Sequence, residues 1–401
     1  MTGPLEGVRI LELTSVVLGP WACQILGDLG ADIIKVEPPK GDSNRQLGPA
    51  RNPAMGSLFL TCNRNKRSLV LDLKQESGRS ALLRLIERAD VLIHNYRPQS
   101  AARLGLDYER VAAVNPRIIY CGTYGYRESG PYGDKAAYDD SIQAASGIAM
   151  LQKRVAGEPR YLPTVVSDKT TSLAVVYAVT SALYFRERKG VGQAIEVPMF
   201  ETMVSYLMAE HLYGLTFKPA LGEAGYVRLM SDHRKPYKTT DGYIAILPYL
   251  DSHWQTFCEL AGRVDLLEDP RFSTLASRLE NIDDTYSEVA DTVATRSTGE
   301  WLEIFAESSV PTMVVNTLDD LLEDPQLVAT DFWKEIDHPT EGRLRMPDVP
   351  VTFSESPGSI RRHPPRLGEH SREILLELGL SDGEIEAMVE SGATCLGSRA
   401  G

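Results

Sequence analysis

The sequence predicts an α/β fold in which a parallel sheet, covered by helices on both faces, forms a large domain and a smaller domain follows. Three observations favour it. Apolar, β-rich runs alternate with helical patterns over the first 125 residues, the pattern changes near residue 215, and 401 residues are enough for two domains. Such alternation is typical of βαβ units, whose strands are parallel.

Five runs rich in Val, Ile, Leu and Tyr are the expected strands. They are VRILEL (8–13), DIIKVE (32–37), SLVLDL (68–73), DVLIHNY (90–96) and RIIYCGTYG (117–125). Helix candidates lie between them at 20–29, 76–88 and 107–113. Because a doubly wound sheet binds ligands at the carboxyl ends of its strands, we expect the functional site there.

A long helix is expected at about 169–188. Apolar side chains occur on nearly every side of it, at Leu173, Val176, Tyr177, Leu183 and Phe185, and it ends in the basic RERKG segment. The pattern therefore predicts a helix that is buried in the core.

The chain beyond residue 214 indicates the second domain. Gly and Pro interrupt 214–248, where PYKTTDGYIAILPY suggests a short strand pair. Further helices are expected around 252–262, 284–296, 299–308 and 371–379, and the segment after 332 is extended and Pro-rich.

Composition and charge exclude several classes of protein. Lys and Arg total 42 against 55 Asp and Glu, and the formal charge of -13 disfavours nucleic acid as a partner. The longest apolar stretch, 172–185, is too short and too polar to span a bilayer, and the N-terminus carries no secretion pattern. We therefore expect a cytoplasmic protein without membrane segments. Five dispersed cysteines without a CxxC pair argue against disulfides and zinc.

Common catalytic motifs are missing. The turn after the first strand reads TSVVLGPWACQILGDLG and lacks GxGxxG, although Glu37 ends the second strand where it would suit a dinucleotide ribose. There is no GxSxG, and the seven histidines show no HExxH spacing. A nicotinamide enzyme, a serine hydrolase and a metal site are therefore disfavoured.

Asp168 stands between the extended YLPTVVS and the apolar helix. Its simplest role is an N-cap, which accepts hydrogen bonds from the first free helix N–H groups. The helix dipole would also keep its carboxylate ionised at neutral pH, so that it serves as a nucleophile without a general base. The neighbouring N–H groups would then bind the oxyanion formed at a thioester. The two roles are compatible.

At this point the chain resembles a known family. The segments that carry the resemblance are PLEGVRILELT, GDLGADIIKVEPP, NRNKRSLVLDLK, ADVLIHNYRP, NPRIIYCGTYGY, SGPYGDKAAYDDSIQAASG, SALYFRERKGVGQAIEVPMFE, EDPRF and RLGEHSREILLELGL. In this order they are similar to the family III CoA-transferases (CaiB/BaiF), which include formyl-CoA and carnitine CoA-transferases and, as a divergent branch, 2-methylacyl-CoA racemase.

The resemblance implies an activity and an architecture. Asp168 would attack an acyl-CoA thioester, giving a mixed anhydride and then an aspartyl-CoA thioester, with CoA as a substrate and no permanently bound cofactor. A Rossmann-like CoA-binding domain would comprise 1–215 and 331–401, and a smaller α+β domain 216–330. Two chains would form an interlocked homodimer, with each active site between the large domain of one chain and the small domain of the other.

The resemblance also implies binding residues. The positions that match CoA contacts are Val17, Leu18, Leu71, Asp72, Lys74, Asn95, Tyr96, Arg97 and Arg103. Arg103, Lys74 and Arg97 would meet phosphates and Tyr96 the adenine, unless the charged ones are only solvated surface groups. Tyr138 and Asp139 would orient the acyl group or Asp168, or simply pack. Independently of the resemblance, Arg228, His233, Arg234 and Lys235 cluster in the expected second domain, and we expect one of them, with Arg228 as the candidate, to bind a distal carboxylate of a dicarboxylic substrate.

Departures from the family pattern bear on the substrate. Val17 and Pro38 stand where formyl-CoA transferases carry Gln and Arg, so formyl and oxalyl transfer are not expected, and the glycine-rich lid has no counterpart in 214–248. Racemases carry Gly-His-Asp where this chain has Ala137-Tyr138-Asp139, so two-base proton transfer lacks a partner. A racemase-like enzyme and a non-catalytic CoA-binding protein remain the alternatives.

Overall fold

The computed structural model describes residues 3–397, which form two compact units. The large unit comprises Met1–Ala149, Tyr161–Tyr206 and Gln326–Gly401, and the small unit comprises Met150–Arg160 and Leu207–Pro325. The chain therefore leaves the large unit and returns to it.

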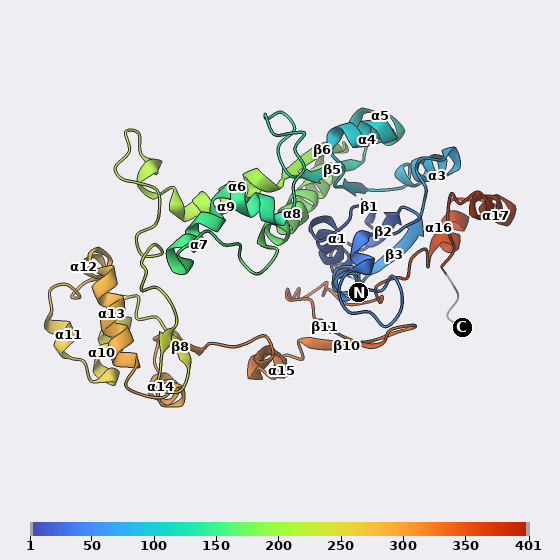
Figure 1. Ribbon diagram of the computed structural model, residues 1–401. Helices are drawn as coiled ribbons and strands as arrows, with labels where there is room; N and C mark the ends of the chain where they lie inside the picture. Colours follow the sequence, from blue (N-terminus) through green and yellow to red (C-terminus); the bar gives the residue numbers. More distant parts are fainter. Residues whose placement is uncertain (1–2, 398–401) are drawn as a thin grey trace. The chain divides into compact units, whose positions relative to one another are not determined.

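A six-stranded parallel sheet is the centre of the large unit (Figure 1). Its strands are β1 (Arg9–Leu13), β2 (Asp32–Glu37), β3 (Lys66–Val70), β4 (Val91–His94), β5 (Ile119–Tyr124) and β6 (Gln193–Pro198). Their order is β3-β2-β1-β4-β5-β6, so the direction of winding reverses between β1 and β4. The predicted α/β fold with a parallel sheet is confirmed.

Helices cover both faces of this sheet. On one face, α1 (Leu18–Asp28) packs on β1 and β2, and α8 (Val166–Lys189) packs on β5, β6 and α1. The other face meets α3 (Glu76–Ile86), α5 (Tyr108–Val114), α16 (Ser371–Glu377) and α17 (Asp382–Glu390) in one apolar cluster. Residues alternate between the faces along each strand, so Leu11 and Leu13 join this cluster while Ile10 points the other way.

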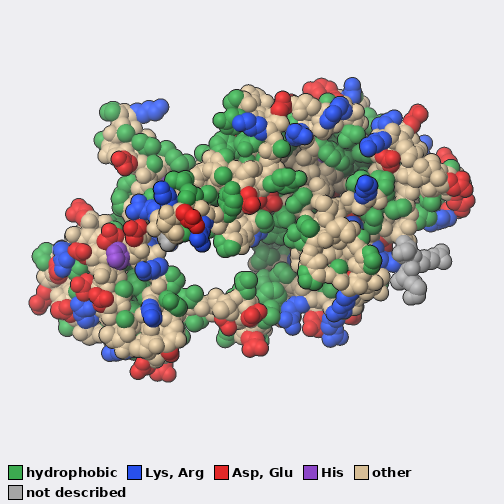
Figure 2. Space-filling view, in the orientation of Figure 1, with side chains coloured by type: hydrophobic (Ala, Val, Ile, Leu, Met, Phe, Trp, Pro, Cys, Tyr) green, Lys and Arg blue, Asp and Glu red, His purple; other side chains and the backbone are tan. Residues whose placement is uncertain are grey.

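The prediction that α8 is buried on nearly every side is wrong. Leu173 is 52%, Tyr177 66% and Phe185 41% exposed, whereas Val175, Val179 and Leu183 are buried. Only one side of α8 packs against the sheet and α1, because the helix lies on the outer layer of the large unit. Its other side presents apolar side chains, and Figure 2 shows such side chains gathered where Figure 1 draws α8 and α9.

The third strand begins and ends earlier than the range 68–73 that the sequence predicts. β3 begins at Lys66, whose ammonium is fully buried and paired with Glu12, and it ends at Val70. Because the strand begins with the charged residues Lys66 and Arg67, a search for apolar runs misses its first residues.

The remaining elements of the large unit are short, and three helices, α7, α9 and α15, contain a boundary between the units. These elements are η1 (Ser43–Gln46), α2 (Ser57–Cys62), α4 (Pro98–Leu104), α6 (Asp139–Ser146), α7 (Ile148–Ala156), α9 (Met199–His211), α15 (Pro325–Ala329), β10 (Trp333–His338) and β11 (Gly342–Pro347). β10 and β11 pair as an antiparallel hairpin within the region predicted to be extended.

The small unit combines a three-stranded antiparallel sheet with helices. The strands are β7 (Tyr237–Lys238), β8 (Tyr243–Ile246) and β9 (Thr312–Val314), and the predicted strand pair is the pair of β7 with β8. The helices are η2 (Tyr213–Thr216), α10 (Asp251–Ala261), α11 (Asp265–Glu268), α12 (Leu275–Glu280), α13 (Ile282–Val293), α14 (Thr298–Phe305) and η3 (Asp320–Leu322). Trp254, Phe257 and Trp301 fill its core.

The thiols agree with their predicted packing role. All five cysteines are free, and Cys23, Cys62, Cys121 and Cys258 are buried. Among the described residues, we find no helix with the length and hydropathy of a membrane span.

Candidate active site

A cavity of about 360 Å³ opens where the winding of the sheet reverses. Its walls come from the loops after β1, β4 and β5, from residues 135–138, and from the first turn of α8. The lining residues are Ser15, Val16, Leu18, Asn95, Tyr96, Arg97, Ser100, Thr123, Tyr124, Gly125, Lys135, Ala136, Ala137, Tyr138, Asp168 and Met199. The cavity therefore lies at the strand ends where a doubly wound sheet binds its ligand.

Asp168, a residue of α8, lines this cavity. The helix begins at Val166, so Asp168 lies in the first turn, and the N-cap role expected from the sequence is wrong. Its side chain is only 8% exposed, and no hydrogen bond or ion pair reaches its carboxylate from the described residues. A buried acceptor without a partner is costly, which suits a reactive group.

Asp139, the first residue of α6, takes over the capping role. Its Oδ1 accepts hydrogen bonds from the backbone N–H groups of Ser167 (2.7 Å) and Asp168 (3.0 Å). Gln143 Nε2 donates to Asp139 Oδ2 at 2.6 Å and so fixes the carboxylate. The next N–H, that of Lys169, donates to the Val165 carbonyl. The oxyanion site expected from these N–H groups is therefore wrong, because other acceptors already occupy them.

The protonation state of Asp168 also differs from expectation. Burial, followed by repulsion from the Asp139 carboxylate, raises the pKa of Asp168 from 3.8 to about 7. The sequence predicted a carboxylate that the helix dipole keeps fully ionised at neutral pH. Desolvation and a like charge outweigh the dipole, so near pH 7 both protonation states of Asp168 are populated.

The hydroxyl group of Ser172 connects the backbone at Asp168 with the backbone at Leu18. Ser172 Oγ lies 2.6 Å from the carbonyl oxygen of Leu18 and 2.8 Å from that of Asp168. Ser172 is fully buried one turn after Asp168. The first loop of the cavity and the start of α8 are thus held in register.

The predicted CoA positions separate into two groups. Leu18, Asn95, Tyr96 and Arg97 line the cavity, whereas buried Val17 does not line it, although both of its neighbours in sequence do. Leu71, Asp72, Lys74 and Arg103 do not line it. Leu71 belongs to the apolar cluster on the opposite face, Asp72 and Lys74 follow edge strand β3, and exposed Arg103 donates to Ser100 Oγ at 3.1 Å.

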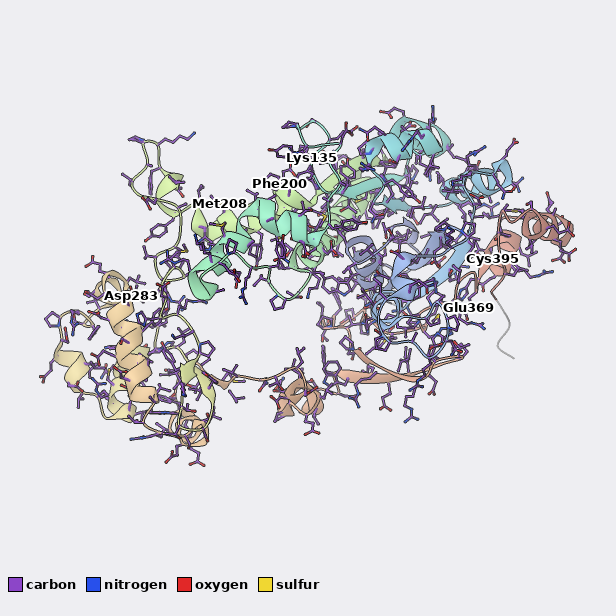
Figure 3. The ribbon with its side chains drawn as sticks, in the orientation of Figure 1. Lys135, Phe200, Met208, Asp283, Glu369 and Cys395 are labelled. Atoms are coloured by element: carbon purple, nitrogen blue, oxygen red, sulfur yellow. The ribbon has the colours of Figure 1, made fainter. Side chains whose placement is uncertain are left out.

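Several lining residues were missed by sequence reasoning. Ser15 and Val16 come shortly after the first predicted strand and Thr123–Gly125 end the fifth one, so their position at strand ends was the available signal. Lys135, labelled in Figure 3, lies at the cavity with its ammonium 3.8 Å from the centre of the Tyr132 ring. Together with exposed Arg97, whose Nη1 donates to the Asp134 carbonyl, it gives the cavity two cations. Two cations suit a phosphorylated ligand.

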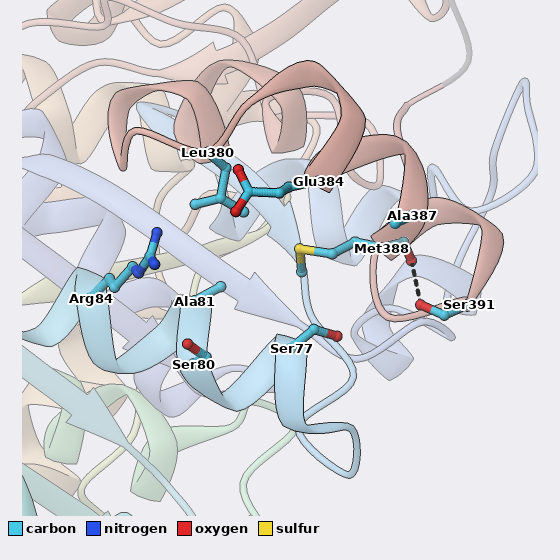
Figure 4. A pocket seen from close by; sticks show the side chains of 9 residues that line it. All are labelled: Ser77, Ser80, Ala81, Arg84, Leu380, Glu384, Ala387, Met388 and Ser391. Atoms are coloured by element: carbon cyan, nitrogen blue, oxygen red, sulfur yellow. Dashed lines mark hydrogen bonds between the residues drawn. The ribbon is translucent and has the colours of Figure 1, made fainter.

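A second cavity, of about 390 Å³, lies between α3 and α17 (Figure 4). Its walls are apolar at Ala81, Leu380 and Met388 and polar at Arg84 and Glu384. It contains no unpaired buried carboxylate or thiol. Within residues 3–397 we find no cluster of three His, Cys, Asp or Glu side chains that would hold a metal ion.

The remaining predicted substrate residues lie in different places. Tyr138 precedes α6, is 72% exposed and lines the cavity of Asp168. Arg228 belongs to the small unit, where its guanidinium stacks 4.9 Å from the centre of the Tyr249 ring.

Comparison with known proteins identifies the family. The family model for CoA-transferase family III matches residues 5–371. The mouse (Mus musculus) succinyl-CoA:glutarate CoA-transferase is 33% identical over 394 residues, covering 97% of this chain and 90% of the relative. The formyl-CoA:oxalate CoA-transferase of Streptomyces coelicolor is 32% identical, covering 97% and 98%.

Solved structures agree as well. The crystal structure of a CAIB/BAIF family protein from Brucella suis matches with a TM-score of 0.79 at 32% identity, covering 94% of this chain and 100% of the other. The family model and the relatives span nearly the whole chain. The chain therefore belongs to CoA-transferase family III, as its sequence motifs indicated, and it is an enzyme of this type.

Proposed function

We propose that this enzyme moves CoA from an acyl-CoA donor to a free carboxylic acid through covalent intermediates on Asp168. One observation carries the proposal: buried Asp168, whose carboxylate has no hydrogen-bond partner among the described residues, lines a cavity whose wall includes four of the predicted CoA positions. A carboxylate in this setting is a nucleophile rather than a structural ion.

The reaction follows from the chemistry of that carboxylate. Ionised Asp168 attacks the thioester carbonyl, and the C–S bond breaks to give a mixed anhydride and the CoA thiolate. The thiolate attacks the aspartyl carbonyl, which releases the donor acid and leaves an aspartyl-CoA thioester. The acceptor carboxylate attacks the aspartyl carbonyl of that thioester, and the C–S bond breaks to give a second mixed anhydride and the CoA thiolate. The thiolate then attacks the acceptor acyl carbon, which forms the new acyl-CoA and releases the Asp168 carboxylate. Because anhydrides hydrolyse, the burial of Asp168 supports this route.

Asp139 and Tyr138 are proposed as orienting residues. Asp139 holds the first turn of α8 through two backbone hydrogen bonds. Burial is the larger cause of the raised pKa of Asp168, and the charge of Asp139 raises this pKa further. An elevated pKa makes a carboxylate a stronger nucleophile once it is ionised. Tyr138 lines the mouth of the cavity and would contact the acyl group.

The CoA moiety would follow the strand ends. Arg97 is a proposed phosphate partner at the cavity, and Lys135 joins it on the evidence of its position. Tyr96 offers a ring face for the adenine. Val17, Leu18 and Asn95 would form the wall around the ligand, and Leu71, Asp72, Lys74 and Arg103 stay proposed contacts outside the cavity.

A dicarboxylic acid is the proposed substrate class. The mouse relative is named for succinyl-CoA and glutarate, and Arg228 in the small unit is a cation for the distal carboxylate. The relative from Streptomyces coelicolor is named for formyl-CoA and oxalate, but Val17 and Pro38 disfavour that chemistry here. Loss of activity with monocarboxylates, but not dicarboxylates, in Arg228→Ala would contradict this assignment.

We further propose that the chain works as an interlocked homodimer in the cytoplasm, with segments 1–215 and 331–401 acting as the CoA-binding domain and 216–330 as the small domain. The exposed apolar side of α8, with Leu173, Tyr177 and Tyr184, supports an interface there. Light scattering should give twice the chain mass, and Tyr177→Glu should lower it. A monomeric unaltered chain would contradict the dimer.

Isotope exchange tests the central proposal. With an acyl-CoA donor and a labelled free acid, the unaltered enzyme should form labelled acyl-CoA, and Asp168→Ala should abolish the exchange while still binding CoA. Asp140→Ala, which removes an exposed neighbouring carboxyl on α6, is the matched control and should retain activity. Hydroxylamine added during turnover should mark residue 168. Undiminished exchange by Asp168→Ala would exclude the proposal, and epimerisation without exchange would favour a racemase.

A further inference from the structure

The first loop of the cavity has a strained backbone. Val16 adopts φ +72°, in the left-handed region that β-branched residues rarely enter, and it lines the cavity beside Leu18. The strain persists only where the surroundings determine the conformation, and such residues cluster at functional sites. Gly19 closes the same loop, since a Cβ there would lie 2.3 Å from the Thr14 Cβ.

Both backbone polar groups of Val16 are held by one short segment. The N–H of Val16 donates to Asp42 Oδ1 at 3.2 Å, and Asn44 Nδ2 donates to the Val16 carbonyl. Asp42 Oδ1 also accepts from the Asn44 N–H at 3.0 Å, so the two partners are fixed to each other. Asp42 and Asn44 are both buried.

A buried charge network holds Asp42 in turn. Lys35 Nζ lies 2.9 Å from Asp42 Oδ2 and 2.8 Å from Glu12 Oε1, and it donates to the Thr14 carbonyl at 3.0 Å. Lys66 Nζ pairs with Glu12 Oε2 at 2.8 Å and donates to the Pro20 carbonyl at 2.7 Å. Two cations balance two anions in this network. It therefore holds the backbone of the loop at Thr14, Val16 and Pro20.

We propose that Asp42 is a positioning residue that keeps residues 14–20, the loop after β1 and the start of α1, in their strained, CoA-accepting conformation, an inference that rests on the proposed function. This loop stands where dinucleotide-binding sheets carry a glycine-rich turn, which the sequence lacks. Here the hydrogen bond from the Val16 N–H to the Asp42 carboxylate stabilises a positive φ that glycine would adopt without strain. Asp42 does not line the cavity and would act through Val16.

Binding of CoA tests this role. Calorimetric titration of the full chain with CoA should show that Asp42→Ala raises Kd roughly tenfold or more, the effect of releasing one such strained residue. In the exchange assay the KM for the donor should rise by a larger factor than kcat falls. Mere loss of folded enzyme would instead lower kcat at unchanged KM.

Two variants separate positioning from stability. Asp28→Asn breaks another buried ion pair, with Arg64 at 2.8 Å, at a residue that does not line the cavity. It should lower Tm and leave the Kd for CoA unchanged. Adding Val16→Gly to Asp42→Ala should restore most of the lost affinity, because glycine adopts a positive φ without steric cost.

Three outcomes would overturn the inference: a normal Kd in Asp42→Ala, an equal loss in Asp28→Asn, or no recovery with Val16→Gly. If Asp42→Ala fails to fold, Asn44→Ala removes one bond to Val16 and leaves the buried charges intact. It should raise Kd by a smaller factor, and an unchanged Kd would refute the role. Binding of CoA does not require a nucleophile. Exchange that survives Asp168→Ala would therefore refute the proposed function, whereas the effect of Asp42→Ala on the Kd for CoA would still hold.

Discussion

Replacing Asp168 by Asn should stabilise the fold, and increasingly so as the pH rises. The side chain is 8% exposed, and its pKa rises from 3.8 to about 7, which is a rise of about three pH units. At roughly 1.4 kcal/mol for each unit, the ionised form costs about 4 kcal/mol of folding free energy above pH 7. Asparagine keeps the shape and carries no charge.

The sign follows from linkage. The folded-state pKa lies above the unfolded one, so the contribution of Asp168 to stability is fully present below pH 3.8 and is lost as the pH rises through about 7. The Tm difference between Asp168→Asn and the unaltered chain should therefore grow from pH 4 to pH 8. Thermal unfolding of both, followed by calorimetry in matched buffers, measures it.

Exposed Asp140 provides the control for this experiment. Asp140→Asn changes the same kind of group one residue after the capping Asp139, and it should show no comparable trend with pH. A Tm difference for Asp168→Asn that is constant across this range, or that shrinks toward pH 8, would show that the carboxylate is not desolvated in the folded state.

Three further outcomes are expected. The kcat/KM of exchange should fall below about pH 7 as Asp168 becomes protonated, and Asp139→Asn should move that fall to lower pH because a like charge is removed; a pH profile in each variant checks this. Glu37→Gln should destabilise the chain by about 3–5 kcal/mol in urea titrations, because buried Arg45 loses its partner at 2.7 Å. Although burial opposes ionisation, Arg45 holds the pKa of Glu37 at about 2, so this loss should shrink below pH 4.5. Trp301→Ala should cost about 3–5 kcal/mol, seen as early loss of amide protection confined to the small unit.

The fold was largely predictable because apolar, β-rich runs alternate with helical patterns along the first 125 residues. DIIKVE is β2 to the residue, and the helix at 166–189 was expected within three residues at its start. The pattern failed where charge replaced apolar character, as at Lys66 in β3, since the pairing of Lys66 with Glu12 is a tertiary contact. It also overstated the burial of α8, because apolar residues such as Tyr177 do not reveal which side of a helix packs.

The sequence predicted Asp168 as the central residue of the candidate site, but it did not predict the raised pKa of Asp168. Family motifs pointed to Asp168, and the expected location at strand ends agrees with the cavity. The raised pKa of Asp168 comes first from burial and then from the charge of Asp139, which is 29 residues away in sequence and reaches the same helix turn only in the folded chain. A local dipole argument cannot include that contact. The same holds for Asp42, whose link to Val16 spans 26 residues.

The hydroxyl of Ser172 has one proton for two carbonyl oxygens, those of Leu18 and Asp168. In the proposed reaction, this bridge fixes the backbone around Asp168 before any acid enters, whatever the length of the acid's carbon chain. On that mechanism we expect discrimination among acids to arise farther from the sulfur, so exchanging residues beyond this bridge offers a way to alter substrate preference while leaving the covalent chemistry in place.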